Sequence, residues 1–222
     1  MTSTMRKTVG RPKDEGLPAR RRQEILNAAA HFFARLGYPN SDLRILADEL
    51  GVAKGTLYRY FPSKKDLFAA TVENCVRQLK AEVDEAVTHV GPPLAKIEQA
   101  VRAYFRFFDQ HPYVVELFIQ ERAEFRAGEK QAYFEHRREN LGPWKELFAE
   151  LSASGKIRNV PVDRAIEVAS NLLYGTMFTK YFSGQEETLE SKTNDVLDTL
   201  FNGLMLKEIT SEDLVVETRK EI

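Results

Sequence analysis

Two short amphipathic segments joined at a glycine constrain the fold of this 222-residue chain more than any other feature. Apolar residues at positions 43, 46, 47 and 50 share one helical face, and Gly51 follows them. A second apolar and aromatic turn runs from Leu57 to Phe61 and stops at Pro62. Helices this short are unstable alone, so neighbouring helices must hold them. The pattern predicts helices over 43–50 and about 54–60 in a helix-turn-helix arrangement.

The rest of the chain keeps the spacing of helices. Apolar residues recur every three or four positions from Ile25 to Leu36, and Ser63 with Asp66 forms a capping pattern before another long periodic run. No stretch alternates between apolar and polar residues for long enough to predict a strand. Glycine or proline interrupts the helical pattern at 91–93, 111–112, 127–128, 155 and 183–184. We therefore expect an all-α chain with about nine helices, the first three forming the helix-turn-helix domain.

Charge is distributed unevenly along the chain. Residues 1–65 carry 13 Lys and Arg against 6 Asp and Glu, whereas the remainder carries 19 against 27. A basic segment joined to an acidic body is typical of a nucleic-acid reader attached to a part that does not touch nucleic acid. We expect a basic flexible arm over 1–19, a DNA-binding domain over 20–67, a helical body over 68–207 and a polar tail over 208–222.

Several classes of protein are disfavoured by what the sequence lacks. No apolar run is long enough to span a membrane, and the N-terminus has no secretory signal core, so a cytoplasmic protein is expected. Cys75 stands alone, and four scattered histidines lack the spacing of metal ligands, so neither a metal nor another cofactor is expected. No hydrolase, metalloprotease or nucleotide-binding motif is present, so we do not expect an enzyme.

The second short helix has the composition of a surface that meets a polyanion. Gly55 permits close approach of the backbone to DNA. Hydroxyl groups of Thr56, Tyr58 and Tyr60 can donate hydrogen bonds to phosphates. Lys54 and Lys64 add positive charge where counterions would be released. A helix held in this way can enter a major groove and present its N-terminal residues to base edges.

These residues also carry a family resemblance over about residues 20–67. Gly37-Tyr38, Leu46-Ala47, Leu50-Gly51-Val52, the run from Gly55 to Phe61, and Ser63-Lys64 with Leu67 resemble the DNA-binding domain of the tetracycline-repressor (TetR) family of bacterial transcription regulators. The resemblance implies that Leu57 and Phe61 belong to the core. It also implies DNA contacts from the second helix, the recognition helix and its exit: Arg44, Lys54, Gly55, Thr56, Tyr58, Tyr60 and Lys64.

The chain departs from the family pattern at two positions. Ala53 stands where the family has a capping serine, and loss of such a cap costs on the order of 1 kcal/mol. Asp42 stands where Ser or Thr is common; it can cap the helix but would repel a phosphate. Arg59 can read guanine and is the candidate for sequence choice, with a solvated surface charge as the alternative.

The basic arm has two interpretations. Gly10-Arg11-Pro12 is similar to the core of arms that insert arginine into a narrow minor groove, but we favour a solubilising tail. The three arginines at 20–22 could meet phosphates in either case.

The larger part of the chain holds candidates for a ligand pocket. In the family, this part is a helical ligand-binding and dimerisation domain. Phe118, Glu121, Arg122 and Phe125 are expected on one helix face, where charges need a ligand or a salt bridge between domains. Asn171, Tyr174 and Phe178 form a stripe with Tyr181 that could line a cavity or face a partner subunit. Trp144 belongs to a concentration of aromatic residues, and such rings fill cores more often than they line pockets.

The last two long helices, expected over about 163–182 and 188–206, are apolar enough to need burial on more than one side. Such pairs build a two-fold four-helix interface with a second copy. The sequence thus predicts a homodimeric, sequence-specific transcriptional regulator, a repressor on a palindromic operator that is released by a small-molecule effector. The alternative is a helical protein-interaction module, or a nucleoid-type DNA binder without a ligand.

Overall fold

The computed structural model describes residues 17–125, 132–184 and 186–203. Helices and no strands are present in these residues, which confirms the all-α prediction. Most of the expected arm, including Gly10-Arg11-Pro12, and the tail over 208–222 lie outside the described ranges. The helices of the described ranges are α1 Leu17–Leu36, α2 Leu43–Glu49, α3 Lys54–Tyr60, α4 Lys64–Val87, α5 Pro93–Gln110, α6 Tyr113–Glu124, α7 Ala132–Glu139, α8 Gly142–Ala153, α9 Val162–Ser183 and α10 Thr193–Asn202.

The described ranges hold ten helices, whereas about nine were expected. The difference arises between α7 and α8, at a break that was not among those read in the sequence. Pro143 lies in the first turn of α8, where its missing N–H is harmless and its fixed φ favours the start of a helix. A second difference concerns α10, which begins at Thr193 because residues 189–192 form a turn rather than a helix.

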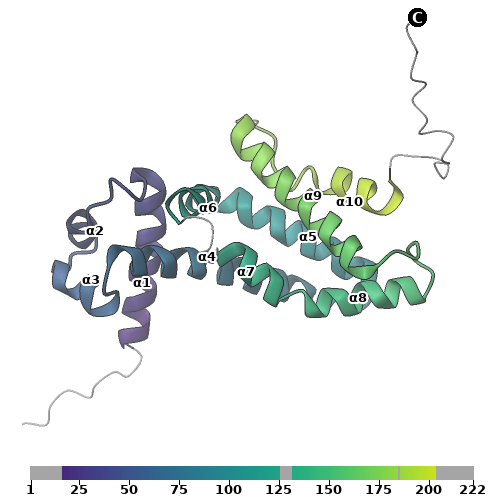
Figure 1. Cartoon of the computed structure of the whole chain (residues 1–222), viewed down its shortest axis with the longest axis horizontal. Helices are drawn as coiled ribbons and strands as arrows, with labels where there is room; N and C mark the ends of the chain where they lie inside the picture. Colours follow the sequence, from purple (N-terminus) through teal and green to yellow (C-terminus); the bar gives the residue numbers. More distant parts are fainter. Residues whose placement is uncertain (1–16, 126–131, 185, 204–222) are drawn as a thin grey trace, which may run out of the picture. The chain divides into compact units, whose positions relative to one another are not determined.

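The chain divides into two units, and the first contains residues 1–78 and 113–136. In it α1 contacts α2 and α6, and α2 contacts α3 (Figure 1). Phe68 of α4 lies at the centre of its aromatic core, with ring centroids 5.0 Å from Phe33, 5.0 Å from Tyr38 and 5.7 Å from Phe125. The helix-turn-helix thus shares a core with α6, although α6 follows it only after α4 and α5.

The second unit contains residues 79–112 and 137–222. Helices α5, α8 and α9 contact one another, and α10 packs on α5 and α9 (Figure 1). Phe105, Phe107 and Phe108 of α5 are buried, and the Tyr104 hydroxyl lies 3.9 Å from the sulfur of Met177. The predicted helix over about 163–182 is confirmed as α9. Of its 22 residues, however, the buried ones are Ile166 and Met177.

Candidate nucleic-acid interface

The turn between α2 and α3 sets the direction of the short helix. Gly51 has φ 63°, a left-handed conformation that other residues adopt only at a cost. The Gly51 N–H donates to Asp48 O (3.0 Å) and the Val52 N–H to Ala47 O (2.9 Å), so the carbonyls at the end of α2 are satisfied. The chain can therefore reverse within three residues and start α3 at Lys54.

Helix α3 has one buried face and one exposed face. Leu57 and Phe61 are 1% and 3% exposed, which confirms their prediction as core. Tyr58 is 40% exposed, and Lys54, Gly55 and Arg59 are exposed as well. Thr56 and Tyr60 are half-buried. The burial of Leu57 and Phe61 holds a seven-residue helix that could not persist alone, and it leaves the polar side chains toward solvent.

Two cations of α3 lie over aromatic rings of the same helix. Lys54 Nζ is 5.5 Å from the ring centroid of Tyr58, and Arg59 Cζ is 5.4 Å from that of Tyr60. Cation–π attraction of this kind favours particular side-chain positions without removing the charge from solvent. Each pair therefore offers a positive charge and a phenol hydroxyl side by side, which suits a phosphate acceptor.

Gly55 lies between these groups on the exposed side of α3. A Cβ built at this position would meet no other atom of the chain within 4 Å. The packing of the protein therefore does not require glycine here. Since glycine weakens a helix by about 1 kcal/mol relative to alanine, an external surface that approaches the backbone closely is the simpler explanation.

Arg44 is exposed but already paired within α2. Asp42 caps this helix by accepting from the Arg44 N–H (2.9 Å), and its other oxygen accepts from Arg44 Nε (2.8 Å) and Nη2 (2.6 Å). These hydrogen bonds lower the pKa of Asp42 to about 2. The Arg44 side chain is 71% exposed, so it can reach a phosphate if it shares or leaves this carboxylate. Its DNA contact stays a prediction.

Lys64 is engaged differently from the other predicted contacts. Its Nζ donates to the carbonyl oxygens of Tyr38 (2.7 Å), Pro39 (3.2 Å) and Ser41 (3.2 Å). An ammonium group has three protons, so these three bonds use all of them. In this geometry Lys64 fastens the α1–α2 loop to the start of α4. A phosphate contact would require one of these bonds to be exchanged, and that role also stays a prediction.

Gln120 of α6 supports the same loop and was not identified from the sequence. Its side-chain oxygen accepts from the Tyr38 N–H (3.0 Å), and its amide nitrogen donates to Phe33 O (3.1 Å). Gln120 is 8% exposed. The sequence did contain a signal for Gln120, because helical spacing places this polar residue on the same face of α6 as Val114, Leu117 and Phe118.

The start of α3 confirms the expected lack of a cap. Ala53 has the extended backbone of an N-cap residue, φ −66° and ψ 142°, but no side chain accepts from the first N–H groups of α3. In contrast, the predicted cap of α4 is present, with Ser63 Oγ accepting from the Asp66 N–H at 3.1 Å. Helix α3 thus has the weaker start of the two.

The residues predicted for a ligand pocket are divided between the two units. In the first unit Phe118, Glu121 and Phe125 are buried, whereas Arg122, which helical spacing places beside Phe118 and Phe125, is exposed. Glu121 accepts from the Ala132 N–H (3.0 Å), and burial raises its pKa. Backbone bonding thus accounts for this buried carboxyl without a ligand.

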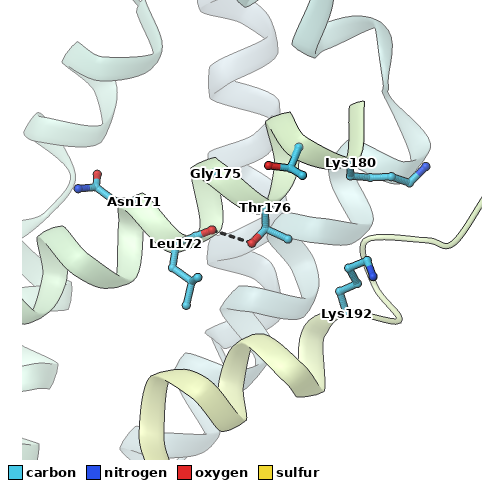
Figure 2. A pocket seen from close by; sticks show the side chains of 7 residues that line it. Asn171, Leu172, Gly175, Thr176, Lys180 and Lys192 are labelled. Carbon is cyan, nitrogen blue, oxygen red and sulfur yellow. Dashed lines mark hydrogen bonds between the residues drawn. The ribbon is translucent and has the colours of Figure 1, made fainter. Parts of the chain in front are cut away.

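The other four candidates lie in the second unit. Trp144 is half-buried on α8. The rings of Tyr174 and Phe178 lie next to each other along α9, with centroids 4.5 Å apart and planes tilted by 51°. Asn171 is exposed and lines a surface hollow beside α10 (Figure 2). The pocket role of these eight candidates stays a prediction.

The described part of the chain offers little for metal or thiol chemistry. In that part no group of three or more His, Cys, Asp and Glu residues could hold a metal ion. Burial raises the pKa of the Cys75 thiol to about 12, which makes it a poor nucleophile. Across the same residues, no helix is both long and apolar enough to cross a membrane.

Comparison with known proteins gives three findings. Residues 25–71 match the model of bacterial regulatory proteins, tetR family. YhgD of Bacillus subtilis, an uncharacterized HTH-type transcriptional regulator, is 31% identical over 104 residues, which cover 47% of this chain and 54% of that protein. Other curated relatives include an HTH-type transcriptional repressor and an HTH-type transcriptional activator. The chain spans about half the length of the curated relatives that it matches first.

Solved structures extend the similarity to the whole fold. FadR from Bacillus subtilis in complex with stearoyl-CoA has a TM-score of 0.70 and 24% identity, over 82% of this chain and 99% of that one. AibR in complex with isovaleryl coenzyme A and operator DNA has a TM-score of 0.64 and 20% identity, over 82% and 98%. Residues 25–71 thus match the tetR family of bacterial regulatory proteins, and the fold of the chain is similar to that of solved regulators.

Proposed function

We propose that this protein regulates transcription by placing α3 in the major groove of duplex DNA. The observation that carries the proposal is the division of α3, with Leu57 buried and Tyr58, Arg59 and Lys54 exposed. Tyr58, Thr56 and Tyr60 would bond phosphates, Gly55 would admit the backbone, and Arg59 would read a base edge. Residues 20–67 form the DNA-binding domain in this proposal.

A homodimer is the second part of the proposal. Val168 and Phe182 of α9 are 57% and 67% exposed, and Phe201 of α10 is 39% exposed. A second copy that packs its own α9 and α10 against these residues would bury them around a two-fold axis. Two copies of α3 about 34 Å apart would then read successive major grooves of a palindromic operator.

The helical body over 68–207 is the effector and dimerisation domain in this proposal. FadR and AibR were solved with acyl-CoA ligands, and AibR also with operator DNA, which supports a small-molecule effector for this chain. An effector that binds preferentially to a dimer conformation whose two α3 helices do not match the spacing of the major grooves would release the DNA. The coupling free energy between effector and DNA would be about 1–3 kcal/mol. We propose a cytoplasmic repressor, in agreement with the repressors among its relatives.

The test is selection of bound sequences from random duplex DNA by the purified protein. We expect a two-fold-symmetric motif, and we expect Arg59→Ala to change the preferred bases. Tyr58→Ala should weaken binding to all duplexes by a similar factor. A motif without symmetry would contradict the dimer, and an unchanged motif after Arg59→Ala would remove the role of Arg59. Steep salt dependence without a motif would favour a nucleoid-type binder, whereas absence of DNA binding would favour an interaction module.

A further inference from the structure

Asp42 and Arg44 form an exposed ion pair at the start of α2. One oxygen of Asp42, Oδ1, accepts from the Arg44 backbone N–H at 2.9 Å and fixes the carboxylate at the end of the helix. The other oxygen, Oδ2, accepts from Arg44 Nε at 2.8 Å and from Nη2 at 2.6 Å. The side chains of Asp42 and Arg44 are 37% and 71% exposed, so the pair is open to an external anion.

The pair lies within electrostatic range of α3. The pKa of Asp42 is lowered to about 2, chiefly by the side-chain hydrogen bonds of Arg44, and the charge of Lys54 adds to the lowering. Lys54 is the first residue of α3. A DNA phosphate that approaches the start of α3 therefore comes within range of this carboxylate as well as of its arginine.

Arg44 differs from the cations of α3 in the charge of its partner. Lys54 and Arg59 lie over tyrosine rings, which are neutral and leave the whole positive charge for a phosphate. The partner of Arg44 is a carboxylate, an oxygen anion that a guanidinium binds as it binds phosphate. A phosphate that pairs with Arg44 must therefore displace Asp42, whereas the rings beside Lys54 and Arg59 hold no charge to displace.

Asp42 is an effective but incomplete partner for Arg44. It is two residues away in the chain, so its effective concentration is far above that of a free anion. Its bond to the backbone holds the carboxylate in place, so little conformational entropy is lost when the side chains pair. However, both side-chain bonds go to one oxygen and use two of the five N–H groups of the guanidinium. A phosphate that presents two oxygens can replace it when α3 holds that phosphate nearby.

We propose that Asp42 competes with a phosphate of duplex DNA for Arg44 and so limits the affinity of the DNA-binding surface. The inference rests on the proposed function and adds to it a residue that opposes binding. In the free protein the carboxylate holds Arg44, and in the complex the arginine exchanges it for a phosphodiester oxygen. The carboxylate is then left unpaired beside a polyanion, which offsets part of the new contact. A neutral capping residue would keep the start of α2 without this competition.

The test is a double-mutant cycle on DNA affinity, measured with the full chain by fluorescence anisotropy at about 0.1 M salt. The labelled duplexes carry random sequence or the motif selected from it. Asp42→Asn keeps a capping side chain and should tighten binding to both about threefold, because Arg44 becomes available. Arg44→Gln should weaken binding about threefold in the unchanged protein and about ninefold in the Asp42→Asn background.

Glu49→Gln is the matched control, because it removes the same charge from the other end of α2. The Glu49 side chain is 41% exposed and pairs with Arg35 at 2.5 Å, so this variant also releases an arginine. Removal of one negative charge favours DNA binding in general, and we expect Glu49→Gln to tighten it by less than about twofold. Asp42→Ser, which caps the helix through a shorter neutral side chain, should match Asp42→Asn.

The Arg44 Nε–H resonance of isotope-labelled protein reports the exchange directly. Asp42→Asn should move this resonance in the free protein, and addition of duplex should move it in the unchanged protein. A resonance that stays in place when the complex forms would show that Arg44 remains with Asp42, and the inference would be wrong.

The affinities can also overturn the inference. Equal gains from Asp42→Asn with and without Arg44 would mean that the carboxylate repels DNA without competing for the arginine. A gain no larger than that of Glu49→Gln, or weaker binding by both Asp42 variants, would equally contradict it. In each of these cases, binding of the unchanged protein to the selected motif would leave the proposed function intact. Binding to neither duplex would overturn both.

Discussion

Helices α3 and α9 use their apolar residues in opposite ways. The seven-residue α3 is too short to be stable alone, and burial of Leu57 in a shared core stabilises it. The 22-residue α9 is long enough to persist, yet Val168 and Phe182 remain exposed. In α3, burial of one face fixes the helix and leaves its polar face for a ligand. In α9, apolar side chains left exposed indicate a surface that a partner would cover. The following predictions test that contrast.

The largest expected effect comes from the anchor of α3. Leu57→Ala removes a side chain that is 1% exposed and should lower the free energy of unfolding by about 2–5 kcal/mol, because a cavity forms under a helix with few other anchors. Urea unfolding followed by circular dichroism measures this change. Tyr58→Ala on the exposed face is the matched variant, with a stability change within about 0.5 kcal/mol but lost DNA affinity. Equal destabilisation by both variants would mean that α3 does not have two distinct faces.

The second prediction concerns the partner of α9. Phe182→Asp places a charge in the proposed interface and should raise the dimer dissociation constant roughly thirtyfold or more, equivalent to about 2 kcal/mol. Analytical ultracentrifugation over a range of concentrations measures it. Leu94→Asp on α5 is the control, since Leu94 is 38% exposed and lies outside α9 and α10. If Leu94→Asp dissociates the protein as much as Phe182→Asp, α9 is not the interface.

The contrast also shows what local sequence signals predict. The turn at Gly51 follows from local spacing and residue type, whereas the core positions Leu57 and Phe61 and the uncapped Ala53 followed from the resemblance of this segment to the TetR DNA-binding domain. The bonds of Gln120 to Phe33 and Tyr38 join residues more than eighty positions apart, and no local rule specifies them.

The hollow on α9 illustrates the same limit. Asn171 was a candidate from its helical stripe, but Lys192, which lines the same hollow, was not, since its place depends on the turn that Asp109 of α5 holds. Arg122 shows the converse: its spacing from Phe118 and Phe125 places it on their helical face, yet its side chain is exposed. Local periodicity therefore predicts elements better than it predicts sites.

A smaller effect is expected at the start of α3. Ala53→Ser places a hydroxyl at an N-cap backbone with ψ 142°, and it should raise the free energy of unfolding by about 1 kcal/mol. The added cap would stabilise α3 without changing its buried anchor Leu57. The variant therefore separates the contribution of capping from that of burial. Thermal unfolding measures it. Ala69→Ser, at an exposed position inside α4, is the control and should give no gain. A gain from Ala69→Ser equal to that from Ala53→Ser would show that capping is not the cause.

The smallest effect is a dependence on pH at the cap of α2, the partner helix of α3. The pKa of Asp42 is lowered from 3.8 to about 2, chiefly by the side-chain hydrogen bonds of Arg44, so folding favours the charged carboxylate. Its contribution to stability is therefore complete above about pH 5 and lost as the pH falls toward 2. Asp42→Asn retains a capping side chain but has no charge, so the difference in urea midpoint between it and the unchanged protein should shrink over that interval. Arg44→Gln removes the cause of the shift and should remove most of the pH dependence as well. If the difference instead stayed constant from pH 5 to pH 2, Arg44 would not be held by Asp42 in solution, and its guanidinium would be available to DNA without any exchange of partners.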